Sequence, residues 1–334
     1  MTRSSRERMA VIPIAAIAAA LLVLNLILQP GLLTPVSWAP LFGSALPFIL
    51  VAMAQVPALI VGNGGLDLSV GPTACLSSVV TVQVLAGAGM GDPYIVIPVA
   101  LLVGVVVGAV NGLLIAVVRI PPIVATLGTY LMIAALSIII MPTAGGHAPA
   151  WLAAASVPVI GPIPGTPLFV VFVGLAWLLL LRTSFRRNLF AVGGDVRTAF
   201  TAGVPVTLVT IGAYVAAGVF AAVAGLGFVS VLGAADPTIG PAYTIISLAG
   251  AALGGVALAG GRGTLTGAAL GGAVLFLVQN ALGALGISVY VIQIVYGVML
   301  ILALTVNWLG DRVGRRTHLK VAGAASDSSS AAAS

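Results

Sequence analysis

Residues that could do chemistry are few in this chain and widely separated. Its 334 residues include 13 Lys and Arg, 7 Asp and Glu, 2 His and 1 Cys. Cys75 lies in an apolar run, which is typical of a packing role, and has no second cysteine for a disulfide. His147 and His318 are too far apart in sequence to suggest a metal site, which needs clustered ligands. We therefore expect this chain to hold no catalytic residue, no metal and no cofactor.

The sequence also lacks a nucleotide-binding loop. A P-loop has the pattern GxxxxGK[ST], in which the Lys contacts phosphates and the hydroxyl contacts magnesium. The nearest segment is 255–264 (GVALAGGRGT), which lacks the Lys, has the wrong spacing and lies between two apolar runs. Asp67 is the one acid near membrane depth, too little for a proton relay. The energy for any active transport is therefore expected to come from another chain.

The composition indicates which class of protein this is. Apolar residues make up 60% of the chain and charged residues only 6%. Soluble globular proteins carry about 25% charged residues, because a wetted surface needs them. The composition excludes a soluble enzyme, a nucleic-acid-binding protein and a disordered chain. The sequence predicts an all-α, polytopic protein whose surroundings are the lipid membrane.

Ten apolar runs approach the length of about 20 residues that a membrane-spanning helix needs. The sixth run is short, and residues 62–68 are expected to form either a loop or a break within a helix. The expected spans are 9–29, 43–62, 68–89, 94–118, 122–141, 167–181, 206–231, 242–259, 264–283 and 288–309.

The basic residues indicate how these spans are oriented. Three arginines precede the first span, and cytoplasmic segments carry an excess of Lys and Arg, so the N-terminus is expected in the cytoplasm. Alternating spans then place all 13 Lys and Arg on the cytoplasmic side, a pattern that nine or eleven spans would break. Both termini are therefore expected to be cytoplasmic. Residues 1–8 would be the N-terminal segment, 9–310 the transmembrane domain and 311–334 a disordered tail.

Polar side chains within or at the ends of spans are candidates to line a route for a neutral, hydroxyl-rich solute. Alternatively, they make hydrogen bonds between helices, worth about 0.6–2 kcal/mol each. The pair Gln279–Asn280 is the better candidate, because adjacent residues point to different faces of a helix. The route candidates are Gln55, Asn63, Asp67, Ser69, Asn111, Gln279 and Asn280.

The longest polar stretch on the expected cytoplasmic side is 182–205. Asp195 follows Gly193-Gly194 and is expected to cap a short helix, for which Gly203 is a stop signal. This helix suits docking in a partner's groove; alternatively, the stretch is a plain interfacial linker. The positions expected on one face by i, i+3, i+4 spacing are Val196, Ala199 and Phe200.

Five segments together resemble the permease subunits of ribose-type carbohydrate ABC importers, in the ribose/branched-chain amino-acid permease superfamily. The resemblance runs from about residue 40 to 310, and the first and last segments are specific when found in this order. The segments are 64–71 (GGLDLSVG), 111–115 (NGLLI), 125–129 (ATLGT), 191–203 (AVGGDVRTAFTAG) and 253–263 (LGGVALAGGRG).

The resemblance implies a multi-pass permease in a bacterial inner membrane, paired with a second copy or a sister permease. It implies ABC ATPase domains on another chain, which bind ATP and Mg²⁺, and a periplasmic or lipid-anchored sugar-binding protein. Segment 188–205 would be the coupling helix that docks in the ATPase. Residues 195–199 depart from the Glu-Ala-Ala frequent in the family, which suggests a dedicated ATPase. The implied coupling residues are Gly193, Gly194, Asp195, Arg197, Ala199, Phe200 and Gly203.

Two residues in these segments keep alternative interpretations. Asp67 caps the next helix, contributes a polar group to the route together with Ser69, or does both. Arg262 braces the coupling helix, or it is a topology charge in a tight turn.

The side expected to face outward carries acids and no basic residue. We expect Asp92, Trp151 and Asp236 to contact the binding protein, the two acids through its basic or polar groups. Alternatively, the acids are exposed and have no partner.

The leading interpretation is therefore the permease subunit of an ATP-driven importer of a monosaccharide or similar small polyol. One alternative is an ABC permease for branched-chain amino acids or another small solute. An ion-coupled secondary carrier is a further alternative, which the shortage of intramembrane charge disfavours.

Overall fold

The computed structural model describes residues 3–303 and 305, with side chains from residue 11 onward. The expected tail at 311–334 and the basic residues between Arg312 and Lys320 lie outside the described residues. Residues 304 and 306–309, at the end of the expected tenth span, also lie outside the described residues. The side chains of Arg3, Arg6 and Arg8 are not described either.

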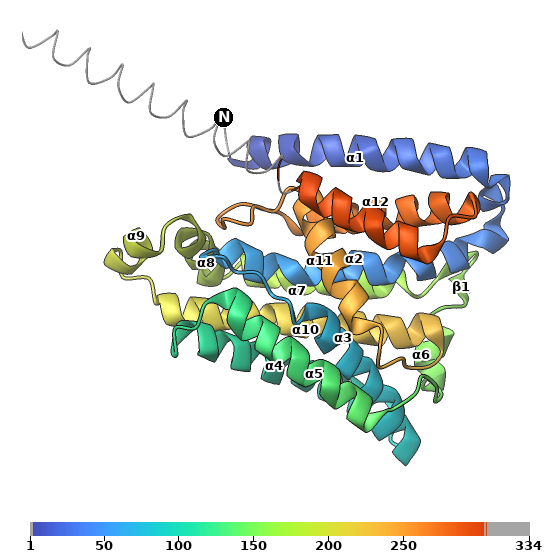
Figure 1. Ribbon diagram of the computed structural model, residues 1–334, viewed down its shortest axis with the longest axis horizontal. Coiled ribbons are helices and arrows are strands. Elements are labelled where there is room, and N and C mark those ends of the chain that lie inside the picture. Colours follow the sequence, from blue (N-terminus) through green and yellow to red (C-terminus); the bar gives the residue numbers. More distant parts are fainter. Residues whose placement is uncertain (1–2, 304, 306–334) are drawn as a thin grey trace, which may run out of the picture.

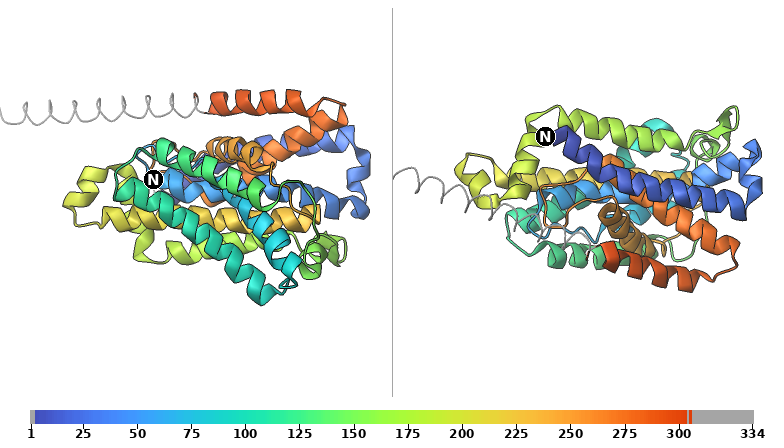
Figure 2. Two further views of the ribbon diagram at one scale, coloured as in Figure 1. Left: turned by 60° about the horizontal axis from the view of Figure 1, so that its bottom comes forward. Right: turned by 90° about the horizontal axis from the view of Figure 1, so that it is seen from above.

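Six helices in this described part are long and apolar enough to cross a membrane. They are α1 (Arg3–Leu28), α2 (Trp38–Val61), α4 (Pro93–Ala116), α5 (Pro122–Ile140), α10 (Val206–Leu232) and α12 (Leu265–Ala284). The long helices run side by side in all views (Figures 1 and 2). The expected all-α, polytopic architecture is confirmed.

The other expected spans contain shorter helices. They are α3 (Val70–Val79), α7 (Pro167–Leu181), α11 (Gly240–Leu253) and a last helix, Val289–Ala303. A π-helical turn, η3 (Val80–Leu85), and a 3-10 turn, η4 (Ala86–Ala88), extend α3. Each of the ten expected runs thus contains a helix, but the number of ten crossings stays a prediction, because these helices are short.

The connecting elements gather at the two ends of the bundle (Figure 1). At one end lie α8 (Ser184–Gly194) and α9 (Val196–Thr201). At the other end lie α6 (Ala150–Ala154) and an antiparallel hairpin of β1 (Pro158–Ile160) and β2 (Ile163–Pro164), in which Ile160 pairs with Ile163. The short turns η1 (Pro30–Leu33) and η2 (Pro35–Ser37) join α1 to α2.

Helix α2 forms the centre of the core. Nearly all of its side chains from Leu46 to Val61 are buried, and it packs against α10, α11 and α12. Small residues let helices approach closely in membranes. Gly104 of α4 and Gly218 of α10 show this, because a Cβ on either would overlap the carbonyl group of the other.

Two of the short helices begin beside one another inside the bundle. After Val61 the chain reverses and runs back along α2 without regular structure, so residues 62–68 are a loop that re-enters the bundle. This brings Asp67 level with Gln55, about 9 Å from the end of α2 at about 1.5 Å per residue. There, Thr244 of α11 donates from Oγ1 to the Leu68 carbonyl oxygen at 3.1 Å. Irregular backbone at membrane depth is tolerated only where protein buries it or where it lines a cavity.

Candidate functional site

The expected coupling segment forms two short helices at one end of the molecule. Helix α8 leaves α7 at an angle of 85°, and α9 follows it after Asp195. The Asp195 cap is confirmed: its Oδ1 accepts the Thr198 N–H at 2.6 Å. This hydrogen bond lowers the pKa of the exposed Asp195 carboxyl below its ordinary value. The cap is therefore present at neutral pH and is lost only as the pH falls through that lowered pKa.

Val196, Ala199 and Phe200 were expected to lie on one face of the helix that is now α9, and this prediction is wrong in one respect. Ala199 is only 3% exposed, whereas Phe200 is 72% exposed, so these neighbours do not share a face. Arg197 is exposed as well. Gly203 ends the segment at φ +78°, a left-handed conformation that favours glycine. The Phe200 ring and the Arg197 guanidinium are therefore both exposed on the short, capped helix α9.

Helix α8 is tied to the bundle by backbone contacts that we call the glycine junction: Gly62, Gly193, Gly260 and Gly261. A Cβ built on Gly193 would overlap the Ile60 carbonyl oxygen, and one on Gly260 would overlap Gly62. The Gly261 N–H donates to the same Ile60 carbonyl at 2.9 Å. The junction thus joins the end of α2, the end of α8 and the loop between α11 and α12. The loop of Arg262 does lie against the coupling segment.

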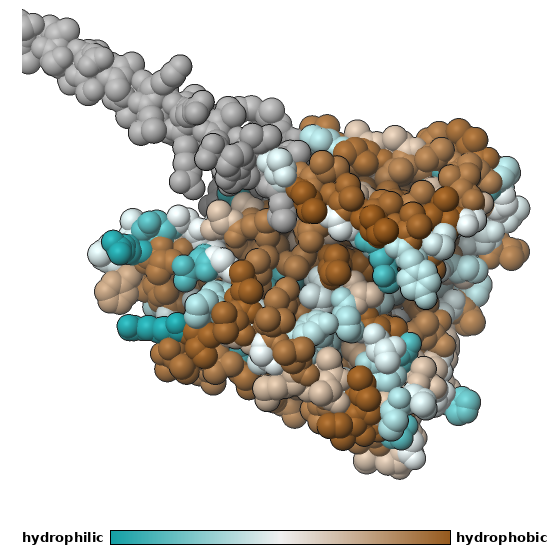
Figure 3. Space-filling model, viewed as in Figure 1, coloured by the Kyte–Doolittle hydropathy of each residue, from teal (hydrophilic) through white to brown (hydrophobic). Residues whose placement is uncertain are grey.

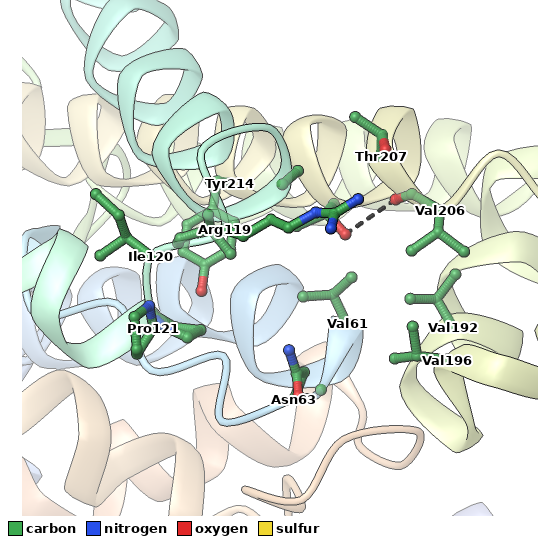
Figure 4. A pocket seen from close by; sticks show the side chains of 15 residues that line it. Val61, Asn63, Arg119, Ile120, Pro121, Val192, Val196, Val206, Thr207 and Tyr214 are labelled. Atoms are coloured by element: carbon green, nitrogen blue, oxygen red, sulfur yellow. Dashed lines mark hydrogen bonds between the residues drawn. The ribbon is translucent and has the colours of Figure 1, made fainter. Parts of the chain in front are cut away.

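A cavity of about 490 Å³ lies next to the junction (Figure 4). Its lining joins Asn63 of the re-entrant loop, Val192 and Val196 of α8 and α9, and Tyr214 of α10. Figure 4 shows the Tyr214 hydroxyl pointing into this space from one side and Asn63 pointing in from the other. The Tyr214 hydroxyl is buried and has no hydrogen-bond partner among the described residues. Any movement of α8 and α9 therefore changes the wall of this cavity.

Four of the route candidates belong to one buried network, which we call the polar network. With its amide oriented so that both atoms find partners, Gln55 donates to the Asp67 carbonyl at 3.1 Å and accepts the Asp67 N–H at 3.0 Å. The Asp67 Oδ1 accepts the Ser69 hydroxyl at 2.6 Å, and Asn111 Nδ2 donates to that hydroxyl oxygen at 2.8 Å. Thr129 Oγ1 donates to Asn111 Oδ1 at 2.7 Å.

The polar network fixes the re-entrant loop rather than opening to solvent. Gln55, Asp67, Ser69 and Asn111 are each at most 1% exposed. Buried polar groups need such partners, since an unpaired group costs about 1–3 kcal/mol. Asp67 also receives the Ser69 N–H at 2.9 Å, just ahead of α3, and Ser69 at the N-cap position makes no capping bond. Asp67 thus accepts a backbone N–H at the start of α3, in agreement with the capping interpretation, and also braces the loop before the helix.

The remaining route candidates lie elsewhere. Asn63 lines the cavity of Figure 4. Asn280 donates from Nδ2 to Asn25 Oδ1 at 2.9 Å, which ties α12 to α1. Gln279, its neighbour, lines a second and larger cavity. The expectation that these adjacent residues point to different faces is confirmed.

The expected docking residues lie at the end opposite α8 and α9. Trp151 Nε1 donates to the Gly91 carbonyl at 2.8 Å, which places this ring beside exposed Asp92. Asp92 Oδ2 accepts the Tyr94 hydroxyl at 2.9 Å. Asp236 folds onto its own turn, where its Oδ1 accepts the Thr238 N–H at 2.8 Å. Asp92 and Trp151 are thus neighbours in one loop cluster.

Sequence reasoning missed two features at the end of the molecule that holds α8 and α9. Helix α8 was not expected, although Phe185, Leu189 and Val192 have the i, i+4, i+7 spacing of a helix face, and the last two are buried. The glycine junction was not expected either. Both glycine pairs, Gly193-Gly194 and Gly260-Gly261, can be seen in the sequence, but nothing in the sequence shows that the two pairs lie against each other.

Comparisons with known proteins agree with this picture. The family model described as "Branched-chain amino acid transport system / permease component" matches residues 37–304. The ribose import permease protein RbsC of Bacillus subtilis is 31% identical over 295 residues, covering 86% of this chain and 89% of that protein. The D-allose transport system permease protein AlsC of Escherichia coli is 30% identical over 265 residues, which cover 78% of this chain and 80% of AlsC.

A third relative has another sugar in its name. The fructose import permease protein FrcC of Rhizobium meliloti is 30% identical over 271 residues, which cover 78% of this chain and 74% of FrcC. No solved structure matches the chain at a significant level.

Proposed function

This chain belongs to the family of branched-chain amino acid transport system permease components, and from that premise we propose that it is the permease subunit of an ATP-driven sugar importer. The observation that carries the proposal is its similarity, over most of its length, to import permeases named for ribose, allose and fructose. These names favour a monosaccharide over a branched-chain amino acid. Permease subunits of this kind are not enzymes, and this multi-pass membrane protein supplies the pathway.

The proposed topology has ten spans in the bacterial inner membrane, with both termini in the cytoplasm. The transmembrane domain would be 9–310, between the short N-terminal segment 1–8 and the tail 311–334. The distribution of all 13 Lys and Arg supports this orientation. It places α8, α9 and the glycine junction on the cytoplasmic side. The loop cluster of Asp92 and Trp151 then faces outward.

The energy would come from an ABC ATPase chain that holds ATP and Mg²⁺, with no cofactor on this chain. Exposed Phe200 on the capped helix α9 suits a groove on that partner. Since α8 contacts α2 and the α11–α12 loop through the glycine junction, a push on α9 reaches the re-entrant loop 62–68 and the loop that follows α11. A sugar-binding protein would dock at the outer end, near Asp92, Trp151 and Asp236. A second permease copy or a sister permease would complete the pathway.

The Phe200 ring provides the direct test of this coupling. Phe200→Asp places a charge where we expect an apolar groove, so the ATPase that co-purifies with the wild type in mild detergent should be lost. Phe200→Leu keeps an apolar side chain and should retain it. The measurement is identification and quantification of the co-purifying chains. Equal recovery of the ATPase with Phe200→Asp would show that α9 is not the docking element.

The Asp195 cap is expected to act through its geometry rather than through its charge. Asn is as good an N-cap as Asp, so Asp195→Asn should keep sugar uptake within about twofold of the wild type. Asp195→Ala removes the acceptor for the Thr198 N–H and should lower both uptake and ATPase recovery. Equal losses in the two variants would instead assign the effect to the negative charge.

A further inference from the structure

The larger cavity, of about 700 Å³, lies between α5, α11, α12 and the last helix, Val289–Ala303. What we infer about it rests on the proposed function. Its volume is within the range of about 300–1,000 Å³ that is typical of small-molecule sites. The polar side chains in its lining are Tyr130, Thr238, Tyr243, Thr244, Gln279, Gln293 and Tyr296.

One wall of this cavity is aromatic and held in place. Tyr243 and Tyr296 pack edge-on against buried Phe48, with ring centroids 5.8 and 6.3 Å from it. Phe228 supports Tyr243 from behind at 4.6 Å. Such packing fixes the orientation of each ring. The wall therefore needs no rearrangement to receive a ligand.

A fixed amide adjoins this wall. The Tyr296 hydroxyl donates to Gln279 Oε1 at 2.6 Å, which directs the Gln279 Nε2 group as a donor and the Tyr296 oxygen as an acceptor. Gln293, one turn before Tyr296 on the last helix, adds a second amide to the lining. Donors and acceptors thus stand beside the aromatic rings.

The cavity does not belong to a lipid-facing surface. Gln293 is exposed on a helix whose neighbours are apolar, including Ile294 at 65% exposed. An amide facing hydrocarbon would lose its hydrogen bonds at a cost of several kcal/mol. Figure 3 shows pale and teal residues gathered between the orange-red helices and the green helices of Figure 1, with brown above and below. We infer that water reaches the cavity along this less apolar strip.

The cavity also lies where the re-entrant loop 62–68 meets the start of α11. Leu68, next to the polar network, and Thr244, in the second turn of α11, both contribute to its lining and are hydrogen-bonded to one another. Helix α11 has 14 residues, about 21 Å at about 1.5 Å per residue, and begins within the membrane if its other end is at the cytoplasmic side. The site is therefore at membrane depth and is connected to the elements that the coupling segment contacts.

We propose that this cavity is a transient sugar-binding site on the route, with Tyr243 and Tyr296 contacting the apolar faces of one monosaccharide and Gln279 and Gln293 hydrogen-bonding its hydroxyl groups. An apolar wall with a few fixed polar groups is the usual composition of a small-molecule site. A neutral solute rich in hydroxyls needs donors and acceptors in equal measure, and amide and tyrosine side chains supply both. The site selects sugar over water and apolar solutes, after the binding protein has released its cargo.

The test uses the whole importer in proteoliposomes, with its ATPase and binding protein, and labelled D-ribose, D-allose and D-fructose. The quantity measured is the ratio of sugar imported to ATP hydrolysed. For Gln279→Leu/Gln293→Leu we expect this ratio to fall about tenfold or more, because two hydrogen bonds to the sugar are lost. Tyr296→Phe keeps the ring and should lower the ratio less. Gln83→Leu, which removes an exposed amide outside the cavity lining, should leave it unchanged.

The outcomes separate this inference from the function on which it rests. If the wild type imports one of the sugars and the double variant keeps the wild-type ratio, the cavity is not a sugar site and the importer proposal stands. A fall in uptake and ATP hydrolysis in the same proportion overturns the inference equally, because it shows a structural role. If the wild type with its ATPase and binding protein imports no monosaccharide in an ATP-dependent way, whether one of these three or another that the binding protein binds, the proposed function itself is contradicted.

Discussion

Replacing Gly193 with alanine is expected to reduce ATP-driven sugar uptake by about tenfold or more. The added Cβ would overlap the Ile60 carbonyl oxygen and crowd the Gly261 nitrogen, so the glycine junction must open. Overpacking of this kind costs about 1–3 kcal/mol and displaces backbone. The displacement lies where α8 meets α2 and the α11–α12 loop, which is the proposed path from the ATPase to the cavities. The measurement is uptake and ATP hydrolysis by the reconstituted importer.

The neighbouring glycine is a matched control. A Cβ on Gly194 would meet nothing within 4 Å, and its φ is not in the left-handed region. Gly194→Ala should therefore keep uptake close to the wild type, although it makes the same chemical change one residue away. If both variants transported normally, close contact at Gly193 would not be needed for coupling. If both failed alike, flexibility rather than contact would explain the glycines.

The Gln55→Leu substitution should have the largest effect on stability. Leucine has a similar size but cannot pair with the Asp67 N–H and carbonyl, which would both be left unpaired in the core. Each orphaned group costs about 1–3 kcal/mol, so we expect the free energy of unfolding to fall by about 2–6 kcal/mol. At roughly 2–4 °C per kcal/mol, the thermal midpoint in detergent would drop by about 4–24 °C.

The control for this substitution is Gln83→Leu. Gln83 is exposed on the extension of α3, so the change from amide to leucine strands no buried group. Its thermal midpoint should match the wild type within about 2 °C, which corresponds to less than about 1 kcal/mol. A Gln55→Leu protein as stable as this control would show that the re-entrant loop does not depend on the pairing with Asp67.

The features that the sequence predicted well are those that a local pattern encodes. Asp195 after two glycines is a capping signal, and the structure shows the expected bond to Thr198. The apolar runs marked the helices because each run must satisfy its own backbone in lipid. Gln279 and Asn280 were correctly predicted to point to different faces of their helix, because adjacent helical residues point about 100° apart.

The features that the sequence did not predict depend on tertiary contact. Leu253 to Val256 lie inside the apolar run 242–259 that was expected to be one span, so hydropathy does not show that α11 ends at Leu253. The return of Asp67 to Gln55 is decided by one side chain pairing with distant backbone. The glycine junction joins three segments far apart in sequence, and no spacing rule relates them. Asp67 and Asn111 are buried braces in this structure, and polarity alone does not distinguish such a brace from a residue that lines a route.

Uptake by the reconstituted protein, with and without its partners, tests the central claim most directly. The purified chain is placed in liposomes alone, or together with the co-purifying ATPase and the binding protein, and labelled ribose, allose and fructose are supplied. The account predicts uptake of at least one sugar that requires ATP, the ATPase and the binding protein, and no sugar movement by the chain alone. Equilibration of a sugar down its gradient by the chain alone, without ATP, would contradict it and identify a carrier of another class.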